Sequence, residues 1–317
     1  MPTSTQQVPP SGFQIELSSG RQAATVVEVG GALRSYTVDG QPLFDGYDLE
    51  ERCTGARGQT LIPWPNRLKD GTYTFGDGDT QHLPLTEPDK HNAIHGLVRW
   101  ANWSVVAQAD EAVTVAHVLH PQSGWPYTLA LSITYRLGPG GLGVTTTATN
   151  VGSSPCPYGT GAHPYLRLAT STVDPLHLQA PGRTWLPTDD QGIPTGVRPV
   201  DGTDYDFRSP RPIGNTVLDT GYGDLERGAD GRARVRLVDP HGGGGVELWM
   251  DDAYGFVMLF TGDSLPQERR RRAALGVEPM TCPPDALRSG TAVVVLGPGE
   301  AHTAEWGITP LDPSGPA

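Results

Sequence analysis

Two alternating segments joined by a glycine- and proline-rich turn restrict most strongly what this chain can fold into. Apolar and polar residues alternate through residues 127–137 and again through 142–150, and Gly138-Pro139-Gly140-Gly141 separates the two runs. A period of two places successive side chains on opposite faces of a β-strand, and Gly and Pro are turn-forming residues. The pattern therefore predicts a long antiparallel hairpin.

Shorter alternating segments continue on both sides of this hairpin. Glycines separate several of them, as Gly30-Gly31 and the run from Gly242 to Gly245 do, which is typical of hairpin turns. Many short strands without helices between them favour a β-sandwich. The predicted strand pairs are residues 24–29 with 32–38, 103–107 with 113–119, and 234–238 with 246–250.

We therefore predict an all-β fold, a large single-domain β-sandwich that spans residues 1–317 and has its core at about 13–310. Only residues 267–275 and 283–287 have patterns that suit one or two helical turns. Two long stretches, 45–88 and 181–224, show no strand pattern. Long irregular loops in compact domains are usually functional, so we expect both stretches to border a cleft.

The composition argues against several classes of partner and site. A formal net charge of −12 disfavours nucleic acid or an anionic membrane as the main partner, because both require basic patches. The three cysteines show no Cys-x-x-Cys spacing, so we predict no disulfide framework and no zinc site, and we expect a reduced, cytoplasmic compartment. We see no signal-peptide pattern, and no apolar run approaches the ~20 residues of a membrane span.

The glycine-rich turn before His163 is the clearest candidate for a catalytic position. Gly159 and Gly161 permit unusual backbone angles or the close approach of another segment, and Pro164 restricts His163 to extended backbone. Tyr165 can stack on the histidine or hydrogen-bond near it. Because the flanking segments have strand patterns, we expect His163 at a strand end that faces a cleft; the alternative is a core histidine.

Glu278 is the second candidate, because apolar residues and a proline surround it. Desolvation of a carboxyl group raises its pKa toward the range that suits a general base. The alternative is a glutamate on an edge strand that faces solvent. Asp219 follows an apolar pair and, by itself, is typical of a turn-forming residue.

Two further polar motifs lie in or just after the first irregular stretch. Asn66 and Arg67 follow two prolines and a tryptophan, and an amide beside a guanidinium can donate several hydrogen bonds to a ligand or form a surface salt bridge. His91 and His95 lie four residues apart, a spacing that binds metal on a helix, but a proline and a glycine flank them. We therefore expect no metal site, and a loop that presents His95 to a ligand; a structural histidine is the alternative.

Taken together, these residues resemble the aldose 1-epimerase (galactose mutarotase) family. The resemblance extends roughly from Phe13 to Ile308 and rests on four motifs in family order, which are Asn66-Arg67, residues 92–96 with His95, His163-Pro164-Tyr165 and Val277-Glu278-Pro279. It implies a large β-sandwich with an open sugar-binding cleft, no cofactor, and a small-molecule sugar as the partner of a monomer or homodimer.

The resemblance also implies a role for each motif. By position, His163 matches the family's general acid and Glu278 its general base. The reaction would interconvert the α and β anomers of a hexose by acid/base opening and closure of the ring. The substrate-binding positions are Asn66, Arg67, His95 and Asp219.

Rival functions stay open at this point. A hexose-6-phosphate 1-epimerase needs arginines over the phosphate, and the candidates are Arg67, Arg99 and the run Arg269 to Arg272, although such a run more often forms a solvated face. A non-catalytic carbohydrate-binding protein would keep the cleft without turnover, and the presence of both Glu278 and His163 argues against it. A glycoside hydrolase usually pairs two carboxyl groups, and no second one lies in an equivalent motif.

Overall fold

The computed structural model describes residues 8–312 and confirms the prediction of an all-β fold. Within these residues the helical elements are α1 (Ala286–Ser289) and the 3-10 turns η1 (Pro88–Lys90) and η2 (Glu268–Arg270). No helix in this part of the chain is long and apolar enough to cross a bilayer. Residues 1–7 and 313–317 of the predicted domain lie outside the described residues.

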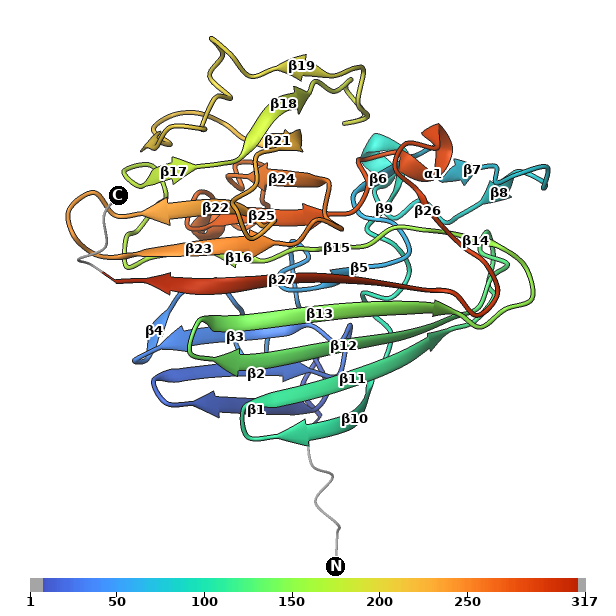
Figure 1. Cartoon of the computed structure of the whole chain (residues 1–317), viewed down its shortest axis with the longest axis horizontal. Helices are drawn as coiled ribbons and strands as arrows, with labels where there is room; N and C mark the ends of the chain where they lie inside the picture. The colour runs from blue at the N-terminus through green and yellow to red at the C-terminus, as the bar shows by residue number, and fades with distance from the viewer. Residues whose placement is uncertain (1–7, 313–317) are drawn as a thin grey trace, which may run out of the picture.

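A nine-stranded antiparallel sheet crosses the whole molecule in Figure 1. Its longest hairpin pairs Leu129 with Asn150 at one end and Gly138 with Gly141 at the turn, which confirms the hairpin predicted from alternation. In order across the sheet the strands are β10 (Ser104–Ala109), β11 (Ala112–Leu119), β12 (Leu129–Gly138), β13 (Gly141–Asn150), β27 (Ala301–Leu311), β23 (Gly245–Met250), β22 (Ala233–Val238), β17 (His177–Gln179) and β20 (Arg211–Pro212).

An eight-stranded sheet carries most of the residues that the sequence singled out. Its central strand β25 pairs with β24 on one side and with β15 and β16 on the other. In order the strands are β19 (Arg198–Pro199), β18 (Gly182–Leu186), β21 (Asp219–Leu225), β24 (Phe256–Phe260), β25 (Leu275–Met280), β15 (Gly161–Ala162) and β5 (Thr60–Leu61), with β16 (Tyr165–Leu166) beside β25.

A four-stranded sheet and three two-stranded ribbons complete the fold. The four-stranded sheet contacts β11 and β12, and in Figure 1 β24 and β25 overlap β22 and β23. The remaining strands are β1 (Gln14–Ser19), β2 (Gln22–Val27), β3 (Leu33–Val38) and β4 (Gln41–Pro42) in the four-stranded sheet, and the pairs β6 (Arg67–Lys69) with β9 (Asn92–Ile94), β7 (Thr72–Tyr73) with β8 (Gln81–His82), and β14 (Cys156–Tyr158) with β26 (Val294–Leu296).

One continuous hydrophobic core joins the three large sheets. It contains Val26 of β2, Ile133 of β12, Leu248 of β23 and Val257 of β24, none of which is exposed. Burial of apolar side chains between facing sheets is the main stabilising contribution to a sandwich of this kind. The three predicted hairpins around this core, β2–β3, β10–β11 and β22–β23, are confirmed by their antiparallel registers. The cysteines are all free, as predicted.

Two predictions about the irregular stretches and the helices were wrong in part. The stretch 181–224 holds β18 and begins β21, and both are strands of the eight-stranded sheet, while 45–88 holds the short strands β5 to β8. Glycines and aspartates in β21 weaken its propensity, but its burial between neighbours decides its structure. Residues 267–275 form only the turn η2 before β25 begins, and the turn predicted at 283–287 is found as α1 at 286–289.

Candidate active site

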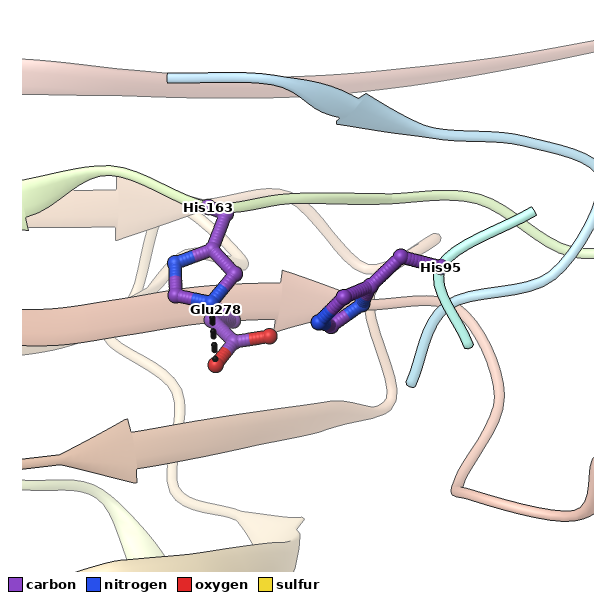
Figure 2. A group of neighbouring side chains, drawn as sticks. All are labelled: His95, His163 and Glu278. Atoms are coloured by element: carbon purple, nitrogen blue, oxygen red, sulfur yellow. Dashed lines mark ion pairs between the residues drawn. The ribbon is translucent and has the colours of Figure 1, made fainter. Parts of the chain in front are cut away.

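A pocket of about 290 Å³ brings all six sequence-predicted site residues together. His163, His95 and Glu278 are buried residues of its lining, and Figure 2 shows their side chains pointing toward one another. The other lining residues are Gly55, Ala56, Asn66, Arg67, Thr86, Glu87, Ile94, Arg99, Tyr165, Asp219, Phe260, Ser264 and Leu265.

The register of three neighbouring strands places Asp219 and Glu278 on one face of the sheet. Met258 of β24 is opposite Glu278 of β25 on one side and opposite Gly221 of β21 on the other. Directly opposite residues in antiparallel strands point to the same face, and so do residues two apart along a strand. Asp219, two residues before Gly221, therefore projects into the same pocket as Glu278.

The glycine-rich turn holds His163 at the junction of β15 and β16. Gly161 is paired with both Leu61 of β5 and Met280 of β25. A Cβ at Gly161 would lie 2.9 Å from the Pro279 carbonyl oxygen, so close approach, and not a positive φ, requires glycine here. This tight packing fixes the backbone from which His163 reaches the pocket.

Tyr165 supports the ring of His163, as its position two residues along an extended segment predicted. The two rings are stacked, with centroids 4.9 Å apart and planes 12° apart. The Tyr165 hydroxyl donates to the carbonyl oxygen of Gly55 at 2.9 Å, and the guanidinium of Arg57 lies 4.4 Å from the centre of its ring. The stack limits rotation of the His163 ring, because the Tyr165 ring is itself held by the hydrogen bond to Gly55 and by the contact with Arg57.

Asn66, Arg67 and His95 come from the same end of the ribbon β6–β9. Arg67 is opposite Ile94, so His95 follows directly after the paired segment. Both Asn66 and His95 have positive φ, at 55° and 64°, a conformation that Asn and His adopt more often than most residues. Main-chain bonding holds this geometry, because the His95 N–H donates to the Asn66 carbonyl oxygen at 2.9 Å.

A second bond in this ribbon fixes the tautomer of His95. The main-chain N–H of Asn66 donates to Nδ1 of His95 at 3.2 Å. Burial, with the nearby charge of Arg99, holds the pKa of His95 well below its usual value, so the ring is neutral. Its proton must then lie on Nε2, and His95 presents an N–H donor toward the pocket.

Arg67 is held by a carboxylate that sequence reasoning did not identify. Its Nε and Nη2 bond to the two oxygens of Glu87 at 2.9 and 3.0 Å, and Nη2 lies 3.8 Å from Asp219. Asn92 also donates to Glu87 at 3.0 Å. No sequence signal marks Glu87, because its pairing with Arg67 depends on how the loop before β9 folds back.

The central feature of the site is the contact between His163 and Glu278. Nε2 of His163 lies 3.2 Å from Oε1 of Glu278, and the side chains are only 6% and 4% exposed (Figure 2). Burial lowers the pKa of His163 to about 3, with the charges of Arg57 and Arg99 adding to the effect. Burial also raises the pKa of Glu278 well above its usual value, with Asp219 adding to the effect. The two residues thus favour an uncharged pair that holds one transferable proton.

The same three residues could in principle hold a metal ion, since one ligand atom from each lies within 4.8 Å of the others. A histidine that binds metal usually donates its second ring N–H to an acceptor. At His95 the second nitrogen receives an N–H from Asn66 instead, so Nε2 keeps its proton and has no lone pair for a metal. The donor set therefore suits hydrogen bonding to a ligand better than metal binding.

Two other candidates from the sequence lie elsewhere. His91 is exposed and its Nδ1 contacts Asp70 at 2.8 Å, outside the pocket lining. In the run Arg269 to Arg272, Arg270 bonds to Asp45 and Glu51, and Arg272 to Asp174 and Asp263. The run is neither in the pocket nor a plain solvated face, because its charges join loops of the protein.

Comparison with known proteins agrees with the geometry. A family model described as aldose 1-epimerase matches residues 14–309. The chain is 33% identical over 299 residues to a protein of Escherichia coli K12 named uncharacterized protein YihR. The matched segment covers 94% of this chain and 93% of that protein. It is 30% identical over 206 residues to the aldose 1-epimerase of the same organism, covering 62% of this chain and 57% of the relative.

Solved structures share the fold. A GalM/aldose epimerase homologue from C. elegans superposes with a TM-score of 0.82 at 22% identity, covering 95% of this chain and 99% of that one. A putative aldose 1-epimerase from Escherichia coli K12 superposes with a TM-score of 0.79 at 22% identity, covering 94% and 98%. The expected β-sandwich of this type is thereby confirmed.

Proposed function

The chain belongs to the aldose 1-epimerase family, whose members are carbohydrate isomerases, and on that premise we propose that it interconverts the α and β anomers of a hexose. One observation carries the proposal. The reactive atoms of His163 and Glu278 lie 3.2 Å apart, and both side chains are buried. O1 and O5 of a cyclic aldose are bonded to the same carbon, so two groups this close can each reach one of them.

The ring opens by two coupled proton transfers. Glu278, as a carboxylate, takes the proton of the C1 hydroxyl, and His163, as an imidazolium, gives a proton to O5. The C1–O5 bond breaks, O1 becomes the aldehyde oxygen, and both protein groups end uncharged. Each transfer of this kind contributes typically ~10²–10⁴-fold to the rate.

The ring closes by the reverse transfers after rotation about the C1–C2 bond. His163 takes the proton of the C5 hydroxyl as O5 attacks the other face of C1, and Glu278 returns its proton to O1. Burial favours the uncharged pair at rest, so a proton first passes from Glu278 to His163 across their 3.2 Å contact. Ring opening converts this ion pair into the uncharged pair, and ring closure restores the ion pair. No proton is gained or lost overall, so the cycle needs no further acid, base or cofactor.

The remaining residues supply hydrogen bonds for sugar hydroxyls. Nε2–H of His95 is a donor, Asp219 is an acceptor at the pocket face, and Arg67 is oriented by Glu87. Fixed donors and acceptors of this kind position a polar ligand at low entropic cost. We assign Asn66 a supporting role, because its Oδ1 accepts the Arg67 N–H at 2.8 Å.

The setting of the protein is also part of the proposal. The three buried free thiols are consistent with a reduced cytoplasmic compartment. A small sugar would be the partner, and a monomer or homodimer the working form.

Polarimetry on freshly dissolved α-D-glucose and α-D-galactose tests the function. We expect faster approach to an unchanged final rotation with the wild type, and loss of this acceleration in Glu278→Gln with sugar binding retained. Glu111→Gln, an exposed glutamate at the surface, serves as the matched control. Wild-type rates in Glu278→Gln would remove Glu278 from the mechanism, and acceleration of no aldose at all would favour a binding protein.

A further inference from the structure

Arg99 is a positive charge in the pocket wall that has no carboxylate partner among residues 8–312. It is partly buried, and burial lowers the pKa of its guanidinium from the usual value. Its only side-chain hydrogen bond to the described residues goes from Nη2 to the Ile94 carbonyl oxygen at 3.3 Å. Its charge reaches both catalytic-site histidines, since it lowers the pKa of His95 and of His163. A desolvated charge without a counterion is costly, so its presence needs an explanation.

The pocket's own carboxyl groups do not supply that counterion. Glu87 is bonded to Arg67, and Asp219 lies 3.8 Å from Arg67. Glu278 faces His163. Each acidic group in the lining is therefore directed at another residue, and the ionic partner of Arg99 is missing from the described protein.

The other arginines proposed as phosphate ligands differ in this respect. Arg67 is bonded to Glu87 through two nitrogens. In the run, Arg269, Arg270 and Arg272 are paired with carboxylates, and Arg271, which donates to the Leu265 carbonyl oxygen, lies outside the pocket lining. Of the three positions open on the sequence, Arg99 is therefore the one that lines the pocket and has no carboxylate partner among residues 8–312.

A second arginine, Arg52, lies against the ring of the residue that follows Arg99 in the chain. The guanidinium carbon of Arg52 lies 5.4 Å from the centre of the Trp100 ring, and that of Arg99 lies 6.0 Å from it. Arg52 is exposed and forms no ion pair among residues 8–312. Two such guanidiniums lie near one half-exposed indole, in a chain whose formal net charge is −12.

We propose that the pocket takes an aldose that carries an anionic substituent, and that Arg99, assisted by Arg52, binds this substituent. The proposal rests on the proposed epimerase function and names its substrate class. The catalytic pair fixes the anomeric carbon at Glu278 and His163, so the charged group lies on a carbon away from C1. Arginine suits phosphate, sulfate and carboxylate groups alike, because its planar fork matches their oxygens.

Exchange spectroscopy tests the substrate class with one method for all sugars. Two-dimensional NMR measures enzyme-catalysed exchange between the anomeric proton signals at equilibrium, so no pure anomer is needed. The probes are D-glucose, D-glucose 6-phosphate, D-glucose 6-sulfate and D-glucuronate. The first is the neutral reference, and the other three carry anionic groups of different charge and shape. We expect kcat/KM for at least one anionic sugar to exceed that for D-glucose by about tenfold or more, and the excess to shrink at high salt.

Variants assign the preference to the two arginines. In Arg99→Gln the ratio of kcat/KM for the best anionic sugar to that for D-glucose should fall about tenfold, with a partial return in Arg99→Lys. Arg52→Gln should lower the ratio less, and its exposed position keeps folding intact. Arg136→Gln, an exposed arginine on β12 that is 63% exposed, is the matched control and should leave the ratio unchanged.

The outcomes distinguish failure of the anionic-substrate proposal from failure of the proposed epimerase function. Exchange of D-glucose as fast as all three anionic sugars would overturn the anionic class and leave the epimerase function standing. Exchange of none of the four sugars, or of neutral galactose, by folded protein would overturn the epimerase function itself. An anionic preference that survives both Arg99→Gln and Arg52→Gln would overturn the assignment to these arginines.

Discussion

The main-chain N–H of Asn66 donates to Nδ1 of His95 across 3.2 Å, and this bond decides which ring nitrogen of His95 carries the proton. The donor is a main-chain group held beside the paired ribbon, so its position is set by the backbone. With this bond made, His95 presents an Nε2–H donor to the candidate pocket.

His95 should be neutral at pH 7, with its proton on Nε2. Burial and the charge of Arg99 hold its pKa well below the usual value, so the cation does not form at this pH. Long-range ¹H–¹⁵N correlation spectra distinguish the tautomers directly. His95→Ala should lower kcat/KM roughly tenfold, the effect of one lost hydrogen bond; a proton found on Nδ1 would contradict the assignment.

Removal of metal ions should leave activity unchanged. The side chains of His95, His163 and Glu278 do not suit a metal ion, because Nε2 of His95 keeps its proton. Protein dialysed against EDTA and returned to metal-free buffer should accelerate anomer exchange at the untreated rate. If activity were lost after this treatment and returned when zinc or another divalent ion was added, the tautomer of His95 would have to be able to change.

The pH profile of kcat/KM should be flat between about pH 5 and 7.5. The pair needs one transferable proton, and burial lowers the pKa of His163 to about 3 while it raises that of Glu278. Activity should therefore fall as acid adds a second proton to the pair near pH 3, and fall again when alkali removes the shared proton. Exchange rates corrected for buffer catalysis, with circular dichroism at each pH, measure this. A limb centred near 6.5 would mean that His163 titrates like an exposed histidine.

Glu278→Gln should stabilise the protein at pH 7 although it abolishes turnover. The folded-state pKa of Glu278 lies above the unfolded value, so its contribution to stability is present at low pH and is lost as pH rises through the folded-state pKa. Glutamine has the same shape and no charge, so it removes the cost of burying the carboxyl group. We expect the free energy of unfolding to rise by about 0.5–2 kcal/mol. Urea unfolding at pH 7 measures it, with Glu111→Gln as the control; destabilisation would indicate that the carboxylate is well solvated.

Asp45→Ala should cost about 3–5 kcal/mol, because it leaves a buried cation without its partner. Asp45 bonds to Arg57 at 3.0 Å and to Arg270 at 3.2 Å, and the Arg57 side chain is fully buried. Asp39→Ala, which breaks the exposed pair with Arg21, should cost at most about 1 kcal/mol. Denaturant unfolding of both variants decides whether burial makes the difference. Similar costs for the two would argue against a buried network.

Much of the fold was readable because alternation is a local signal. The hairpin β12–β13 has one face in the core, and every second residue of β12 is buried, so its sequence alternates. β25 could not be read in this way, because all six of its residues are buried and no polar face breaks the run. Its Gly276 and Pro279 also disfavour a strand, and only pairing with β24 and β15 overrides that preference.

The sequence by itself determined the all-β class and which residue types were available for acid/base chemistry, because both depend on local patterns. The tertiary structure decided that Glu278 meets His163, that Glu87 pairs with Arg67, and that Arg99 has no carboxylate partner among residues 8–312. Burial sets the protonation of the first pair, and the distances between segments far apart in the sequence set the other two relationships. Neither quantity exists in a chain until its strands have packed.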